Sequence, residues 1–265
     1  MWEIFSISLL LGALSGVLAG LFGIGGGLVI VPILMMLFSM QAIIPIEQQM
    51  LFAIATSLAT IVFTASSSVL AHHRQGNVLW SKVARLTPGI IIGAIIGAVI
   101  AHKISGDDLR FIFIAYLSYT ALKMAFKTSS KATEIVKQKK SLDYIASGGI
   151  GFLSSILGIG GGSLTVPYLV ACQVPIKNAV AISSACGLPI ALAATLSYIF
   201  LGLQQPNLPE WSLGYIYLPA FFGIVLCSIL TAPLGAKLAT QLPAVKLKRY
   251  FSIMLFIMAL KMIFA

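Results

Sequence analysis

Apolar runs separated by short polar stretches make up almost the whole chain and divide it into ten segments. In the first half these runs cover residues 4–22, 28–38, 50–71, 83–101 and 109–126. In the second half they cover residues 142–157, 163–172, 179–201, 213–238 and 247–264. A helix needs about 20 residues to cross the hydrocarbon core of a bilayer, and most of the runs approach that length. The pattern predicts an all-α membrane protein.

The second run of each half is too short to cross a membrane. At a rise of 1.5 Å per residue, residues 28–38 would span about 16 Å, which is roughly half of a bilayer core. Both short runs follow a cluster of glycines, and glycine is unfavourable inside a helix because of its backbone freedom. We therefore expect two half-helices, each paired in a hairpin with the run before it and bent at the glycines.

The two halves repeat one sequence pattern. Residues 23–32, GIGGGLVIVP, recur as residues 158–167, GIGGGSLTVP, with seven of ten positions identical. Residues 121–126, ALKMAF, recur as residues 259–264, ALKMIF, with five of six identical. Two matches in the same order predict a duplicated unit. We assign residues 1–127 to a first repeat of five segments, 128–141 to a polar cytoplasmic linker, and 142–265 to a second repeat of five segments.

Composition and charge agree with a chain solvated by lipid. The chain is 59% hydrophobic and 9% charged, whereas soluble domains carry about 25% charged residues. Its net charge of +10 comes from Lys and Arg residues that lie between the apolar runs, as in the loops that flank membrane helices. The bilayer is therefore the expected surrounding, and no nucleic acid partner is expected.

The distribution of positive charge predicts the topology. If each glycine hairpin returns to the side it came from, 14 of the 17 Lys and Arg residues share one side, and Lys103, Arg110 and Lys261 face the other. The richer side is then cytoplasmic, and both termini lie outside. Each repeat crosses an odd number of times, so the repeats have inverted topology and their glycine-broken hairpins meet near the bilayer midplane. Inverted repeats of this kind occur in secondary transporters.

The glycine turns are the first candidates for a substrate site. A helix begins after each turn, and the unpaired N–H groups and dipole of a helix N-terminus favour an anion. The alternative is that these glycines only allow close helix packing, which also explains Gly89, Gly93 and Gly97 on one helical face. The candidate glycines are Gly23, Gly25, Gly26, Gly27, Gly158, Gly160, Gly161 and Gly162.

Hydroxyl groups near the turns are the second candidates, because they can donate to oxyanion oxygens without burying a charge. Leu28 and Ile30 stand in the first turn where the second has hydroxyls. For each hydroxyl, a role in helix packing stays open beside a role in binding. The candidates are Ser163 and Thr165 after the second turn, and Thr56, Ser57, Ser183 and Ser184 in the third segments.

Charged and metal-binding chemistry is sparse inside the runs. All seven acidic residues lie at or beyond segment ends, whereas cation and proton pathways usually place carboxylates within the membrane. We therefore expect an anionic cargo, and no enzyme, catalytic residue, metal site or cofactor. Cys172, Cys186 and Cys227 are interpreted as small buried residues, and the role of His72 is left open.

At these residues the chain resembles the sulfite exporter TauE/SafE family, also called the toluene sulfonate uptake permease family. The resemblance covers the length, the duplicated glycine turns with their downstream prolines, the paired hydroxyls of the third segments and the polar central loop. Members of that family move sulfite, thiosulfate or organosulfonates across the cytoplasmic membrane. The resemblance implies that the eight glycines named above build the substrate site.

We therefore expect a secondary transporter of a small sulfur-containing anion in the cytoplasmic (inner) membrane, working by alternating access. The alternative is an anion channel, or a small-anion carrier without specificity for sulfur compounds. The sequence does not fix the cargo, the direction of transport, the coupling ion or the oligomeric state, and a homodimer stays open.

Overall fold

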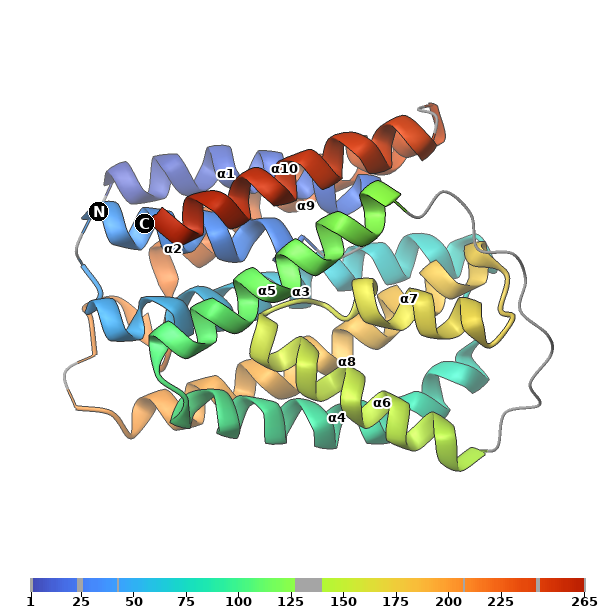
Figure 1. The fold of residues 1–265 in the computed structure, drawn as a ribbon, viewed down its shortest axis with the longest axis horizontal. Coiled ribbons are helices and arrows are strands. Elements are labelled where there is room, and N and C mark those ends of the chain that lie inside the picture. The colour runs from blue at the N-terminus through green and yellow to red at the C-terminus, as the bar shows by residue number, and fades with distance from the viewer. Residues whose placement is uncertain are drawn as a thin grey trace.

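The computed structural model describes residues 2–22, 26–41, 43–126, 140–206, 208–241 and 244–264. Within these ranges the chain forms ten α-helices and one short β-hairpin (Figure 1). The first five helices are α1 (Trp2–Phe22), α2 (Gly27–Gln41), α3 (Ile46–Arg74), α4 (Trp80–Lys103) and α5 (Gly106–Phe126). The rest are α6 (Lys140–Leu157), α7 (Gly162–Ala171), α8 (Ile176–Leu203), α9 (Leu218–Gln241) and α10 (Ala244–Phe264), with the hairpin of β1 (Ser212–Leu213) and β2 (Ile216–Tyr217) between α8 and α9.

The helices follow the ten apolar runs and confirm the expected all-α membrane protein. In the described ranges α3, α4 and α8 are long and apolar enough to cross a membrane by length and composition. The second helix of each half is short, as predicted: α2 has 15 residues and α7 has 10. The predicted central linker falls largely on residues 127–139, which lie outside the described ranges.

The start of the ninth segment differs from the sequence prediction. Residues 213–217 were expected to be helical, but they form most of the hairpin, in which Ser212 pairs with Tyr217 and Leu213 with Ile216. Gly214 has a φ of 57°, a left-handed conformation that turns the chain and that glycine adopts without steric cost. Helix α9 begins only at Leu218.

Glycines bring two pairs of helices into close contact. A Cβ atom added to Gly16 of α1 would lie 2.6 Å from Ser228 Cα of α9, and one added to Gly93 of α4 would lie 2.9 Å from Phe152 N of α6. Small residues allow this approach in membrane proteins. Helix α1, the first helix of the first half, packs on α9, the fourth helix of the second half. Helix α6, the first helix of the second half, packs on α4, the fourth helix of the first half.

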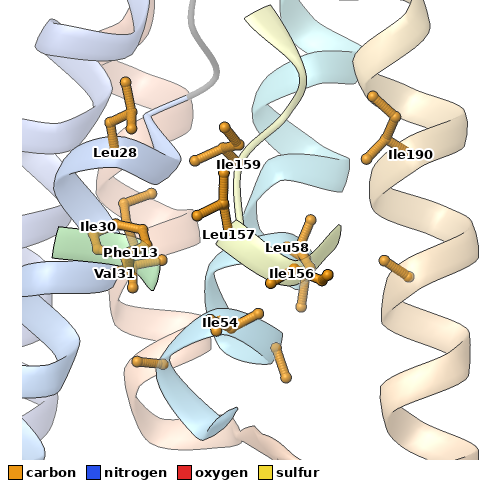
Figure 2. Packing of buried hydrophobic residues seen from close by; sticks show 14 of the residues in the cluster. Leu28, Ile30, Val31, Ile54, Leu58, Phe113, Ile156, Leu157, Ile159 and Ile190 are labelled. Carbon is orange, nitrogen blue, oxygen red and sulfur yellow. The ribbon is translucent and has the colours of Figure 1, made fainter. Parts of the chain in front are cut away.

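The core lies between the two halves. Helix α3 packs against α8 at the centre of the molecule, and α2 is buried along most of its length. Figure 2 shows buried residues of α2, α3 and α8 around the segment that follows α6. The long helices run roughly along the horizontal axis of Figure 1, where the N and C labels lie near each other at the left.

Polar contacts connect residues near the ends of helices at two opposite ends of the molecule. At one end, Asn178 at the start of α8 donates to the Asn77 carbonyl between α3 and α4 (2.9 Å), and Tyr168 of α7 donates to Asp143 of α6 (2.7 Å). At the other end, Tyr215 of the hairpin lies 3.0 Å from His102 Nδ1 of α4, and Arg110 of α5 donates to the Met262 carbonyl of α10. We call these the cleft end and the hairpin end.

Candidate functional site

The glycine turns have the same backbone geometry in both halves. Gly26 has a φ of 78° and Gly161 a φ of 73°, conformations that a side chain would strain. The Gly26 carbonyl accepts from the Ile30 N–H (3.0 Å), and the Gly161 carbonyl accepts from the Thr165 N–H (2.7 Å). In each half a left-handed glycine therefore turns the chain and starts a short helix.

The two turns meet near the centre of the molecule. A Cβ atom added to Gly27 would lie 2.9 Å from Ile159 Cα and closer still to the Gly158 carbonyl oxygen. A Cβ atom added to Gly187 of α8 would lie 2.8 Å from the Gly160 carbonyl oxygen. In the view of Figure 2, Ile159 lies between Leu28 of α2 and Ile190 of α8. Side chains at these glycines would force the backbones apart.

Two unpaired hydroxyls converge on the second turn. The point where a Cβ of Gly161 would lie is 3.3 Å from Thr165 Oγ1 and 3.5 Å from Ser154 Oγ. Both residues are fully buried, and neither hydroxyl has a hydrogen-bond partner among the described residues. The same is true of Ser155 and Ser183. Buried hydroxyls are normally hydrogen-bonded, because leaving them unpaired costs about 1–3 kcal/mol.

Two of these hydroxyls, those of Ser154 and Thr165, lie beside the N-terminus of α7. Ser154 and Ser155 lie in the last turn of α6, Thr165 in the first turn of α7, and Ser183 lies one turn before Gly187 on α8. The atoms nearest Gly158, Gly161 and Gly187 all belong to neutral residues. Helix N–H groups and hydroxyl donors without a charged side chain are a suitable environment for the oxygens of a small anion.

Several predicted hydroxyls already have partners in this structure. Ser57 donates to the Gly158 carbonyl (2.8 Å), so it holds the second turn in place. Thr56 accepts from the Tyr217 N–H (3.1 Å) and fastens the hairpin to α3. Ser163 lies 2.7 Å from the Tyr116 hydroxyl of α5. Ser184 donates to the Val180 carbonyl (3.0 Å) and accepts from Ser68 of α3 (3.2 Å).

The hydroxyl pairs of the third segments do not occupy equivalent positions. Helices α3 and α8 both begin after a proline, Pro45 and Pro175. Counted from these prolines, Ser57 corresponds to Gly187, while Ser183 lies one helical turn closer to its proline than Ser57 does.

Sequence reasoning missed Ser154, Ser155 and Gly187. The two serines come just before the second glycine motif, in SSILGIGGG, so a wider window around the motif would have included them. Gly187 carries no local signal and is identified by its contact with the second turn. Of the predicted glycines, Gly23 and Gly25 lie outside the described residues.

The two turns differ in polarity, as the sequence indicates. In the first half, Leu28 and Ile30 are 1% and 2% exposed and fill the space beside the turn with apolar atoms. In the second half, Ser163 and Thr165 stand at the same positions, and Thr165 is fully buried. The candidate site is therefore built mainly by the second turn, with the first turn as its apolar neighbour.

A cleft of about 200 Å³ opens at the cleft end and not between the turns. Its lining residues come from α4, α6 and α7 together with the residue that ends α7: Lys82, Arg85, Leu86, Asp143, Tyr168, Leu169 and Cys172. Leu169 is buried and lies one turn after Thr165, so both are on the inner face of α7. The cleft and Thr165 are therefore one helical turn apart along the same face of α7.

Comparisons with known proteins give a consistent result. The family model described as "Sulfite exporter TauE/SafE" matches residues 8–262. A probable membrane transporter protein of Haemophilus influenzae is 41% identical over 99% of both chains. One of Methanocaldococcus jannaschii is 29% identical over 96% of this chain and 94% of its own, and YunE of Bacillus subtilis, also a probable membrane transporter, is 32% identical over 75% and 79%. No solved structure matches the chain.

Proposed function

This chain belongs to the sulfite exporter TauE/SafE family, whose members are membrane transporters and not enzymes, and from that premise we propose that it carries a small sulfur-containing anion. The cargo is sulfite, thiosulfate or an organosulfonate, and the membrane is the cytoplasmic membrane. The anion binds at the second glycine turn.

One observation carries this proposal: the buried, unpaired hydroxyls of Ser154 and Thr165 point to the same space beside Gly161. Each hydroxyl has one proton to donate, and an oxyanion offers several acceptors at once. Hydrogen bonds to a charged group are worth about 1.5–3 kcal/mol each. Gly161 adds no side chain to the space between the hydroxyls, which Ile190 Cδ1 borders at 2.5 Å from the Cβ position, so the end of the Ile190 side chain moves aside when the anion binds.

The proposed mechanism is alternating access by two inverted repeats, residues 1–127 and 142–265. Two features support it: each half packs its first helix on the fourth helix of the other, and the contact between Tyr168 and Asp143 brings the end of α7 back to the start of α6. Rocking of one repeat against the other would then expose the site to each side in turn. The positive-inside rule places the cleft end in the cytoplasm and both termini outside.

The test is transport by purified protein in liposomes. We expect saturable movement of labelled sulfite, thiosulfate or methanesulfonate, and we expect Thr165→Val to raise KM by about tenfold or more, from the loss of one hydrogen bond to a charged group. The matched control is Thr195→Val, because Thr195 also has an unpaired hydroxyl on the described structure but does not border a glycine turn. Failure of the wild-type protein to move any of these anions would refute the proposal.

A further inference from the structure

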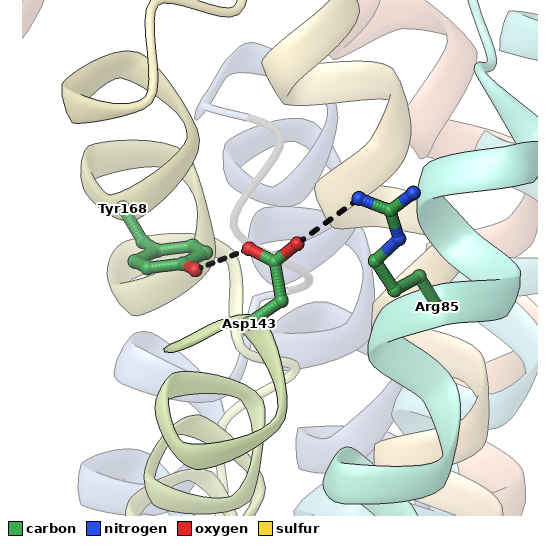
Figure 3. Close-up of polar contacts among 3 residues, drawn as sticks. All are labelled: Arg85, Asp143 and Tyr168. Carbon is green, nitrogen blue, oxygen red and sulfur yellow. Dashed lines mark hydrogen bonds and ion pairs between the residues drawn. The ribbon is translucent and has the colours of Figure 1, made fainter. Parts of the chain in front are cut away.

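A carboxylate at the cleft end links three helices. Asp143 of α6 accepts at Oδ1 from the Tyr168 hydroxyl of α7 (2.7 Å) and at Oδ2 from Arg85 of α4 (3.4 Å). Figure 3 shows Asp143 between the other two side chains. Asp143 thus joins a side chain of α7 to a side chain of α4.

The cleft beside this carboxylate carries excess positive charge. It is lined by two cations, Lys82 and Arg85, against the one carboxylate of Asp143. The Arg85 side chain is 41% exposed and that of Asp143 is 15% exposed, so solvent screens and weakens their ion pair. A guanidinium has five N–H donors, and the bond to Asp143 occupies one of them.

The size of the cleft suits a small hydrated anion. Its volume of about 200 Å³ compares with about 30 Å³ for one water molecule in the liquid. An anion of four or five heavy atoms therefore fits together with a few of its hydration waters. Planar guanidinium groups bind oxyanions well, because two N–H donors can meet two oxygens.

We propose that this cleft is an entry site for the transported oxyanion, in which the anion replaces Asp143 on Arg85. The inference rests on the proposed function, since it concerns the same cargo. Asp143 acts as a built-in competitor that occupies Arg85 while no anion is present. When the anion takes Arg85, Asp143 and Tyr168 remain paired with each other, and α6 remains packed on α4 through Gly93.

The entry site lies close to the candidate binding site, because both border the same face of α7. Helix α7 has only 10 residues and begins directly after Gly161, which can act as its hinge. Leu169 lines the cleft, and Thr165, one turn away on the same face, borders the candidate site. A displacement of the Leu169 side chain would therefore join the cleft to Thr165.

The test measures transport of sulfite presented from each side of the membrane separately. We expect Arg85→Gln to raise KM about tenfold when sulfite is presented at the cleft end, because a charge-assisted hydrogen bond is lost. We expect Asp143→Asn, which removes the competitor, to lower the same KM. The control is Lys103→Gln, which removes an exposed cation at the hairpin end. All four KM values measured from the opposite side should agree.

A binding measurement complements the kinetics. The measurement uses the variant Cys227→Ala, which keeps two cysteines. Of these, Cys172 in the cleft is half-buried and Cys186 is fully buried. We expect methanesulfonate to slow the reaction of Cys172 with a membrane-impermeant maleimide, and Arg85→Gln to abolish this protection. Methanesulfonate is the probe because sulfite itself adds to maleimides.

The outcomes separate this inference from the proposed function. If the wild-type protein moves no anion, the proposed function fails. A second outcome is that the wild-type protein moves sulfite, that Arg85→Gln and Asp143→Asn have the same KM as Lys103→Gln from both sides, and that Cys172 is not protected. The proposed function then holds, and the entry site is refuted. Equal KM changes from both sides would also overturn the inference, because they would place the effect away from a one-sided entry site.

Discussion

The substitution Gly161→Ala tests the candidate site most directly, because it adds one carbon atom between the two hydroxyls. The new Cβ would lie 3.3 Å from Thr165 Oγ1 and 3.5 Å from Ser154 Oγ, where we place an oxygen of the anion. An anion excluded from that space loses two hydrogen bonds of about 1.5–3 kcal/mol each, so KM should rise at least about a hundredfold.

The same substitution also affects stability, and this effect has to be separated from binding. Alanine at a φ of 73° costs about 1–2 kcal/mol. The Cβ would also lie 2.5 Å from Ile190 Cδ1, the mobile end of a side chain, and its displacement adds about 0.5–1.5 kcal/mol. A total of about 1.5–3.5 kcal/mol is below the stability of about 5–15 kcal/mol that is usual for folded proteins, so we expect the variant to fold.

A matched control is Gly76→Ala between α3 and α4. Gly76 has a φ of 69°, and a Cβ added there would have no atom within 4 Å. It therefore carries the backbone strain alone and should lower the thermal unfolding midpoint while leaving KM unchanged. The double variant Gly161→Ala with Ile190→Val relieves the contact with Ile190 and should regain stability without regaining transport. If Gly161→Ala transports with the KM of Gly76→Ala, the second turn does not bind the anion.

The remaining predictions concern packing and the hairpin, and each is measured as a change in the thermal unfolding midpoint in detergent. Gly93→Ala should prevent α4 from docking on α6, because its Cβ would press on the backbone of Gly148 and Phe152, whereas Gly149→Ala meets nothing within 4 Å and should be tolerated. Equal stability of these two variants would contradict the packing described. Thr56→Val should destabilise the protein by about 1–3 kcal/mol, because it leaves the buried Tyr217 N–H without its acceptor. Ser66→Ala on the same helix removes an exposed hydroxyl and should have little effect, so equal losses for Thr56→Val and Ser66→Ala would count against this assignment.

The features that the sequence predicted well are those with a local cause. Hydropathy alone locates the helices, because a segment surrounded by lipid must be apolar over its length. The turns were recognisable because few residues other than glycine adopt the left-handed backbone found at Gly26 and Gly161. The close packing predicted for Gly89, Gly93 and Gly97 is confirmed by their contacts with α6.

The features that the sequence could not predict depend on contacts between distant segments. Ser57 is paired with the Gly158 carbonyl across 101 positions of sequence, and Asp143 joins Arg85 across 58. No local pattern shows which of several hydroxyls will find a partner and which will stay unpaired. The hairpin escaped prediction because Tyr215, Ile216 and Tyr217 are as apolar as the helix that follows, so hydropathy merges the two.

The placement of charge suggests how such a carrier can bind an anion and still release it. A buried cation at the glycine turns would attract the anion strongly, since charges interact far more strongly in a low-dielectric interior than in water. The described residues next to Gly161 instead offer neutral donors, while Lys82 and Arg85 lie in the cleft, where solvent weakens their attraction. Transport requires binding that is favourable enough for entry and weak enough for exit. Cations in the solvated cleft favour entry, and neutral hydroxyls at the turn allow exit, so together they meet both requirements. By the same reasoning, a cation introduced at the turns should bind the anion too tightly and slow its release.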